Sequence, residues 1–294
     1  MFKEVLRKIM EEKKIAIVTD SSCDLSDEQL KRHNINMISL RVVCQNKEYR
    51  DRVDITESEL YELLEHELPK TSLPLPEDIT TLYDRLVSEG YTDIIHLSIS
   101  SGLSGTYNLV RMLTEDYTDR VNVHLVDTLT LSTGLGLLVL IVAEALEAGS
   151  SIEEAIEMAK EARKKQMAVF VIRTLEFLRK GGRIGKVEGV IGSILNIKPV
   201  IYVNDEGVYE TIGKARGYKN SIEVMMSEVK RFFAEGNARI TVVNGNARED
   251  AAKVLERLKK EIKTLPDAFI SQVSPVLAVH TGPGLIGIIG CRDM

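Results

Sequence analysis

The sequence contains no tryptophan, and aromatic residues make up only 5% of its 294 positions. Proteins that stack nucleic-acid bases use aromatic platforms, so this composition argues against that class. The net charge of −6 argues the same way, because a nucleic-acid footprint needs a clustered surplus of Lys and Arg. We therefore expect no nucleic-acid partner, although a small basic patch for a protein partner is compatible with these numbers.

Cysteines and long apolar runs are also scarce. Cys23, Cys44 and Cys291 are far apart and have no CxxC spacing, so neither a disulfide framework nor a zinc site follows. The most apolar run, 135–143, is too short to span a bilayer. The first 14 residues have no apolar core of a secretory signal and predict a short amphipathic helix. We expect a cytoplasmic protein with no bound metal and no stable membrane insertion.

Nucleotide and nucleophile motifs are absent as well. There is no GxGxxG fingerprint and no GxSxG nucleophile elbow. The segment "GGRIGK" (181–186) resembles a P-loop, but it is one residue short, and Val187 stands where Ser or Thr should hold magnesium. The sequence therefore predicts neither a nucleotide site nor any other cofactor.

Strand-like and helix-like segments alternate through the first half of the chain. Buried strands are expected at 14–20, 93–100 and 121–128, and extended segments at 35–51, with a hairpin as one arrangement. This alternation predicts a mostly parallel sheet with helices on both faces. The expected helices span 26–34, 56–68, 77–90, 101–117 and 133–149.

The pattern changes near residue 166, after a helix expected at 152–166. The second half predicts an α+β arrangement with a mixed sheet, including two strands around the turn 204–207 and a strand pair in 275–290. The length favours two domains, placed at 1–160 and 161–294. The remaining segments are strands at 167–174 and 238–246 and helices at 175–185, 190–196, 221–236 and 248–262. The expected fold class is α/β in the first domain and α+β in the second.

Short polar residues end three of the predicted strands: 20–22, 100–101 and 127–128. Each could serve only as a helix N-cap, a position that Ser, Thr and Asp favour. Together they favour a ligand site, because open parallel sheets bind ligands outside the carboxyl ends of their strands. The stretch "SISSGLSGTYN" (98–108) further predicts an anion held by backbone N–H groups at the start of a helix.

Histidine positions leave alternatives open. His280 ends a predicted strand, before the turn-forming "TGPG", and can point into a site. With His280 as base and Ser101 as nucleophile or anion clamp, the chain would be a hydrolase or transferase acting on a small anion. A phosphotransfer domain with a phosphorylated histidine is a weaker alternative, because His33 is expected in a helix and His96 in mid-strand.

Seven segments, taken in order, resemble the DegV family, the bacterial fatty-acid-binding proteins that serve as lipid-presenting subunits of fatty acid kinase. The resemblance covers nearly the whole chain. The segments are "IAIVTDSSCDL" (15–25), "TSLPLP" (71–76), "SSGLSGTYN" (100–108), "VDTLTLSTGLG" (126–136), "TLEFLRKGGRIGK" (174–186), "IGSILNIKPV" (191–200) and "HTGPG" (280–284).

The resemblance implies a C14–C18 fatty acid held between the two domains, with no other cofactor. It implies a lipid-binding subunit rather than an enzyme: a partner kinase brings ATP and converts the bound carboxylate to an acyl phosphate for phospholipid synthesis. A C16 tail buries about 14 methylenes at ~0.8 kcal/mol each, roughly 11 kcal/mol before costs. A hydrogen bond to a charged group adds only about 1.5–3 kcal/mol. The tail would therefore supply most of the affinity, and the polar groups would fix the position of the carboxylate.

Site residues carry over from the same resemblance, in two groups. The "TSLPLP" segment departs from the family's usual "TSQPS", and the first 13 residues precede the usual start. The choice between Ser100 and Ser101 as carboxylate ligand stays open. The ligand-binding residues are expected to be Thr71, Ser72, Ser100, Ser101, Ser104, Gly105, Thr106, Arg173, His280 and Thr281, and the kinase-docking residues Arg183, Lys214 and Arg216.

Overall fold

The computed structural model of the chain describes residues 13–292, apart from Asn46, 191–195, Gly236 and 263–267. The amphipathic helix expected at the N-terminus lies outside these residues, and so does most of the helix expected at 190–196.

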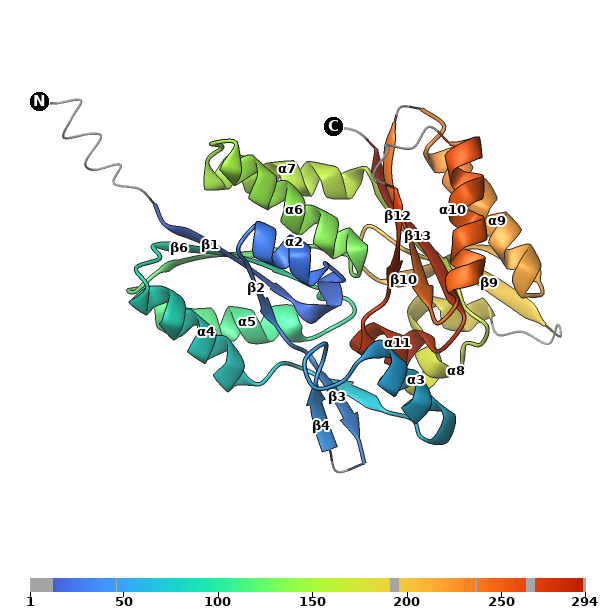
Figure 1. Cartoon of the computed structure of the whole chain (residues 1–294), viewed down its shortest axis with the longest axis horizontal. Coiled ribbons are helices and arrows are strands. Elements are labelled where there is room, and N and C mark those ends of the chain that lie inside the picture. The colour runs from blue at the N-terminus through green and yellow to red at the C-terminus, as the bar shows by residue number, and fades with distance from the viewer. Residues whose placement is uncertain (1–12, 46, 191–195, 236, 263–267, 293–294) are drawn as a thin grey trace, which may run out of the picture.

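Four parallel strands form the first sheet, in the order β2-β1-β6-β7. They are β1 (Ile15–Asp20), β2 (Ile35–Ile38), β6 (Asp93–Ser98) and β7 (Asn122–Asp127). Figure 1 shows α4 (Pro76–Ser88) and α5 (Thr106–Thr114) below this sheet, and α2 (Asp27–Arg32) and α6 (Thr133–Glu147) above it. The central strands β1 and β6 are almost wholly buried because helices cover both faces. This confirms the predicted parallel sheet.

The second sheet has six strands in the order β10-β9-β8-β13-β11-β12, and its pairs are antiparallel except for β11 with β12. One face packs on α9 (Tyr218–Phe232) and α10 (Arg248–Glu261). The mixed sheet expected for the second half is therefore confirmed. Its strands are β8 (Gln166–Val171), β9 (Ile197–Val203), β10 (Tyr209–Arg216), β11 (Ala238–Gly245), β12 (Phe269–Gln272) and β13 (Leu285–Arg292).

A small antiparallel sheet, in the order β4-β3-β5, lies below the seam between the two larger sheets (Figure 1). Its strands are β3 (Arg41–Cys44), β4 (Lys47–Arg50) and β5 (Lys70–Ser72). Next to it, α3 (Glu57–His66) begins with the predicted capping box between Thr56 and Glu59. The other helices are α7 (Ile152–Lys164), α8 (Glu176–Lys180) and α11 (Pro275–Thr281), with 3-10 turns η1 (Ser21–Cys23), η2 (Glu115–Tyr117) and η3 (Gly185–Val190).

Two expectations were wrong. The strand pair predicted in 275–290 is instead helix α11 followed by β13. A short apolar run fits a buried helix and a buried strand equally well, and the decisive signal was Pro275, which is favoured at the first helical position. The helix predicted from residue 101 begins only at Thr106, because residues 101–104 form a turn.

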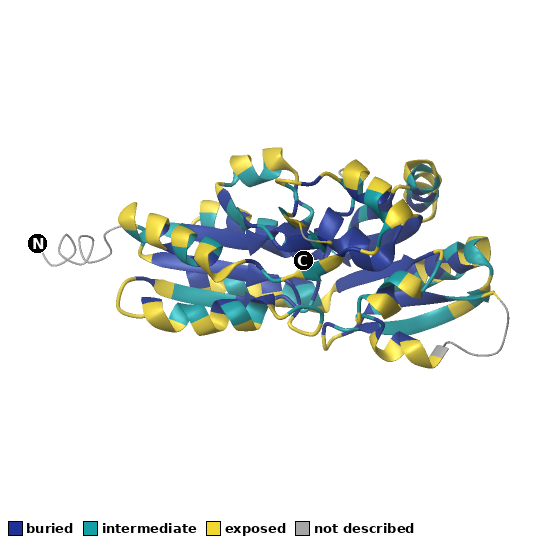
Figure 2. Ribbon diagram, turned by 90° about the horizontal axis from the view of Figure 1, so that it is seen from below, coloured by how far each residue is buried: buried dark blue, intermediate teal, exposed yellow. Residues whose placement is uncertain are grey.

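One hydrophobic core runs through both larger sheets. It joins Leu135 and Leu138 of α6 to Phe170 of β8, Ile201 of β9 and Ile289 of β13. Figure 2 shows buried ribbon continuing from one half of the molecule into the other. No helix in the described residues is long and apolar enough to cross a membrane.

Candidate ligand-binding site

The three polar strand ends lie side by side, since β1, β6 and β7 are neighbours in the first sheet. Backbone N–H groups at these strand ends already donate to Asp20 and Asp127, the acids at the ends of β1 and β7. Asp20 accepts hydrogen bonds from the N–H groups of Ser22 (3.1 Å) and Ile99 (2.8 Å), and burial raises its pKa. Asp127 accepts from the N–H of Ser101 at 3.1 Å. This edge of the sheet is thus closed by internal hydrogen bonds.

Ser100 and Ser101 differ in what their hydroxyls contact. The buried Ser100 Oγ donates to the carbonyl of Gly207 at 2.7 Å and accepts from the N–H of Gly102 at 3.2 Å. It therefore ties the loop after β6 to the turn between β9 and β10. Ser101 is exposed. The Ser100 hydroxyl is therefore used within the fold, and the exposed Ser101 hydroxyl is the better candidate of the two for contacting a ligand.

A second cluster forms where α11 meets β5. His280 Nε2 lies 2.8 Å from Thr71 Oγ1, a contact between residues 209 positions apart in the sequence. His280 is buried, and burial together with the charge of Arg183 lowers its pKa to about 3. The ring is therefore neutral near pH 7. Its buried Nδ1 has no hydrogen-bond partner in the part of the chain that the structure describes.

Arg183 is the cation beside this histidine. Its Nη1 donates to the carbonyl of Gly181 at 2.7 Å, and its Nε donates to the carbonyl of Leu103 at 3.2 Å. These two bonds fix the half-buried guanidinium between the loop after β6 and the end of α8. Sequence reasoning assigned Arg183 to the docking surface, whereas the structure places it in the Thr71–His280 cluster.

Glycines allow the close packing that builds this cluster. A Cβ on Gly181 would overlap the His280 ring, and a Cβ on Gly282 would overlap the ring of Phe177. Gly282 also has a φ of +67°, which L-residues rarely adopt. Gly181 and Gly282 are therefore required because α8 and the end of α11 pass each other in direct contact.

The segment Ser104–Thr106 adjoins the cluster through Leu73. Ser104 Oγ lies 2.8 Å from Thr106 Oγ1, and a Cβ on Gly105 would meet the Leu73 side chain at 3.5 Å. Two other predicted ligands point elsewhere: Ser72 is exposed on β5, and the buried Thr281 hydroxyl donates to the carbonyl of Leu277 at 3.2 Å.

Arg173 and two of the predicted docking residues, Lys214 and Arg216, are not part of this cluster. The Arg173 guanidinium stacks 4.4 Å from the centre of the Tyr218 ring and lies 3.6 Å from Asp250. Lys214 and Arg216 are exposed on β10. The structure thus brings together Thr71, His280 and Arg183, with Ser104–Thr106 alongside, and it places Arg173 in a different set of contacts.

An apolar cavity of about 40 Å³ lies in the seam beside α11. Residues from both halves of the chain line it, and Leu277 and Thr281 come from the helix that carries His280. Sequence reasoning did not locate this cavity, because its walls come from segments far apart in the chain. The other lining residues are Leu131, Ser132, Ala168, Val169, Phe170, Val203, Tyr209, Val243, Val273, Leu285 and Ile289.

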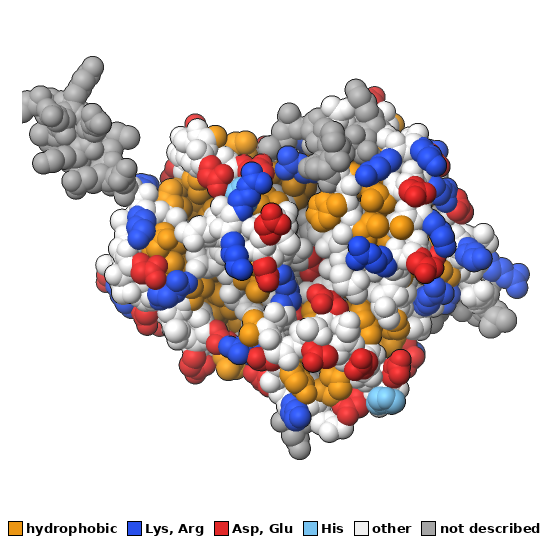
Figure 3. All heavy atoms as spheres, viewed as in Figure 1, with side chains coloured by type: hydrophobic (Ala, Val, Ile, Leu, Met, Phe, Trp, Pro, Cys, Tyr) orange, Lys and Arg blue, Asp and Glu red, His pale blue; other side chains and the backbone are white. Residues whose placement is uncertain are grey.

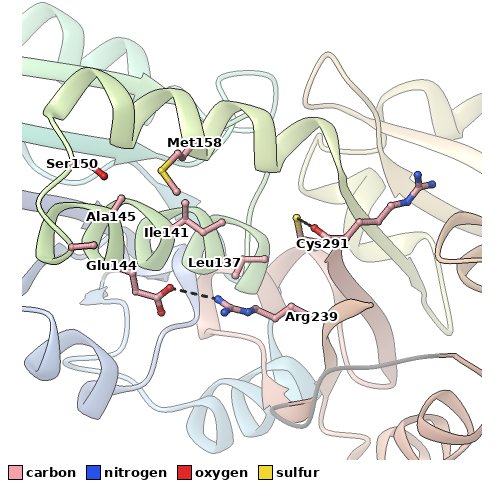
Figure 4. A pocket seen from close by; sticks show the side chains of 10 residues that line it. Leu137, Ile141, Glu144, Ala145, Ser150, Met158, Arg239 and Cys291 are labelled. Atoms are coloured by element: carbon pink, nitrogen blue, oxygen red, sulfur yellow. Dashed lines mark hydrogen bonds and ion pairs between the residues drawn. The ribbon is translucent and has the colours of Figure 1, made fainter. Parts of the chain in front are cut away.

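A second hollow, of about 310 Å³, lies between α6, α7 and the second sheet. In Figure 4 the side chains of Ile141 and Met158 face it, and an ion pair of 3.8 Å joins Glu144 to Arg239 across it. Among the described residues no group of three or more His, Cys, Asp or Glu side chains could hold a metal ion.

Comparison with known proteins shows the family of the chain. The family model described as "Uncharacterised protein, DegV family" matches residues 14–293. The chain belongs to the DegV family. A DegV domain-containing protein of Clostridium acetobutylicum is 39% identical over 277 residues, which make up 94% of this chain and 98% of the relative.

Solved structures of similar proteins have the same fold. A fatty-acid-binding DegV protein from Thermus thermophilus is 32% identical, with a TM-score of 0.87 over 95% of this chain and 100% of that one. A stearic acid-binding protein from Eubacterium ventriosum is 30% identical, with a TM-score of 0.86 over 95% of this chain and 98% of that one.

Proposed function

We propose that this DegV protein binds a long-chain fatty acid (C14–C18) between its two proposed domains, 1–160 and 161–294, and presents the carboxylate to a partner kinase. The observation that carries the proposal is the cluster of Thr71, His280 and Arg183 on α11 and its neighbours, because α11 also lines the apolar seam cavity. The fatty-acid-binding relatives support the same ligand class.

The head group would be held by a neutral donor pair and one nearby positive charge. The Thr71 hydroxyl and His280 Nε2 are hydrogen-bonded to each other at 2.8 Å; on binding, this bond would be exchanged for one from the hydroxyl and one from the Nε2–H to the carboxylate, and Arg183 would balance its charge. The Ser101 hydroxyl would supply a further donor from the neighbouring loop, and Ser104–Thr106 would lie alongside it. Each hydrogen bond to the charged group contributes about 1.5–3 kcal/mol.

The acyl tail would occupy the seam. The cavity of about 40 Å³ is much smaller than the ~300–1,000 Å³ of ordinary ligand pockets, so its lining side chains must move apart as the tail enters. Leu131 precedes α6, whereas Phe170 lies on β8, so the tail contacts both domains at once. Binding is therefore expected to stabilise the contact between the domains.

Phosphorylation would belong to the partner. The chain has no nucleotide motif, so a kinase brings ATP, and the bound carboxylate leaves as an acyl phosphate for phospholipid synthesis. Arg183 and His280 would hold the added phosphate. Lys214 and Arg216 on the exposed face of β10 would dock the kinase. Figure 3 shows Lys and Arg side chains, with Asp and Glu among them, on the half of the molecule that holds α9 and α10.

The lowered pKa of His280 argues against the alternative, a hydrolase or transferase that acts on a small anion. A general base works best when its pKa lies near the working pH, and the pKa of His280 is lowered to about 3. The ring is therefore suited to donating a hydrogen bond, not to accepting a proton.

Solvent extraction of the purified protein followed by mass spectrometry tests the ligand class. We expect a C14–C18 fatty acid to be released in stoichiometric amount. A protein that carries no lipid, and that binds neither added palmitate nor added oleate, would refute the proposal.

A further inference from the structure

Helix α11 is buried along its whole length and is held at its first turn by two carboxylates from the first half of the chain. Asp24 accepts a hydrogen bond from the N–H of Ser274 at 3.0 Å, and Asp51 accepts one from the N–H of Val276 at 3.0 Å. Pro275 has no N–H. Asp24 and Asp51, 27 positions apart in the sequence, therefore bind the first free N–H groups of α11. The last turn of this helix carries His280.

The Asp51 carboxylate is out of contact with bulk water, whereas Asp24 is partly exposed. Asp51 is 0% exposed, and its Oδ2 is buried without a hydrogen-bond partner among the described residues. Asp24 also accepts from the hydroxyl of Ser132, at the start of α6. Hence one acid joins α11 to α6, and the other joins it to the loop that follows β4.

The electrostatic surroundings make both acids hard to ionise. Burial raises the pKa of Asp51 to about 7 and that of Asp24 to about 6, and the charge of Asp24 raises the pKa of Asp51 further. Arg52 lowers both, and the first turn of α11 supplies no titratable side chain. Of the other titratable groups nearby, Cys23 has a pKa raised to about 12 and Tyr61 has a pKa also raised by burial, so neither changes charge near pH 7. Burial raises the pKa of Asp20 as well, and its hydrogen bonds from Ser22 and Ile99 are present in all the proteins compared below.

We propose that Asp51, assisted by Asp24, is a positioning residue whose charge state sets how firmly α11 presents His280 to a bound carboxylate. The inference rests on the proposed function. It implies that the affinity for the fatty-acid carboxylate depends on whether Asp51 carries a proton. With Asp51 protonated, the first turn of α11 packs against at most one negative charge, that of Asp24. With Asp51 ionised as well, the two negative charges repel each other, and the buried Asp51 carboxylate gains water only if α11 moves away from it.

Direct repulsion between an ionised Asp51 and the bound carboxylate also weakens binding as pH rises. The helix rises about 6 Å between Val276 and His280, so Asp51 and a carboxylate at His280 lie on the order of 10 Å apart. At an effective dielectric constant of about 20, two like charges at that distance weaken binding by roughly tenfold. Fatty-acid affinity is therefore expected to fall as pH rises through about 7, and binding near pH 7 is expected to take up protons.

The test measures palmitate affinity at about pH 6 and about pH 8 in three proteins. Asp51→Asn keeps an oxygen for the N–H of Val276 but cannot ionise, and Asp54→Asn is the matched control, because Asp54 lies in the same loop and pairs with Arg50. We expect wild type and Asp54→Asn to lose about tenfold more affinity than Asp51→Asn over this range. Because palmitate itself titrates equally in all three experiments, a difference among the proteins reports the effect of Asp51 alone.

Equal pH dependence in wild type and Asp51→Asn would overturn the inference while leaving the proposed function intact. No palmitate binding by wild type at either pH would overturn the proposed function and the inference with it. If Asp51→Asn does not fold, calorimetry on wild type in buffers of different ionisation enthalpy decides the matter: net proton uptake near pH 7 supports the linkage, and zero uptake or proton release contradicts it.

Discussion

Gly181→Ala is expected to damage the head-group site while leaving the fold in place. Gly181 ends α8 with a φ of −77°, which alanine adopts without backbone strain, so the whole effect is steric. The new methyl group would overlap the His280 ring, which is buried and must shift. Overpacking of this kind costs about 1–3 kcal/mol of stability.

The binding loss follows from the displaced ring. Losing one hydrogen bond to a charged group removes about 1.5–3 kcal/mol, a weakening of roughly 10- to 150-fold. The matched control is Gly189→Ala, because a Cβ at Gly189 meets nothing within 4 Å. Urea denaturation reports the stability change, and displacement of a fluorescent fatty acid reports affinity. Wild-type affinity in Gly181→Ala would refute the assignment of His280 to the head group.

Two further predictions separate structure from function. Ser100→Ala should destabilise the fold by about 1–3 kcal/mol, because the buried carbonyl of Gly207 loses its donor. Ser101→Ala should change stability by less than about 0.5 kcal/mol. Equal effects of the two substitutions in urea denaturation would contradict the role given to Ser100. Combining Lys214→Glu with Arg216→Glu should slow acyl-phosphate formation by the kinase without changing palmitate affinity, and unchanged turnover would remove β10 from the docking surface.

The parallel sheet was predictable from the sequence because β1 is a continuous apolar run and β6 is one interrupted only by His96, both bounded by polar residues. Helix α3 was predictable because Thr56 and Glu59 form a capping box. Helix α11 was not predictable from periodicity, because every one of its side chains is buried and no polar face marks a helical repeat.

The site was predictable only in part. Family resemblance placed Thr71 and His280 in the same site, and no local pattern links residues 209 positions apart. Arg183 was assigned to docking because a sequence does not reveal that its guanidinium bonds back to Gly181 and Leu103. The carboxylates of Asp24 and Asp51 escaped notice because their partners are backbone N–H groups of a helix formed more than 200 residues later.

A crystal structure of the protein with bound palmitate tests the central claim most directly. The proposed function predicts the carboxylate within hydrogen-bonding distance of Thr71 Oγ1 and His280 Nε2, with the tail between Leu131 and Phe170 in a widened seam. A carboxylate bound instead at Arg239, with the tail in the groove between α6 and α7 shown in Figure 4, would contradict it.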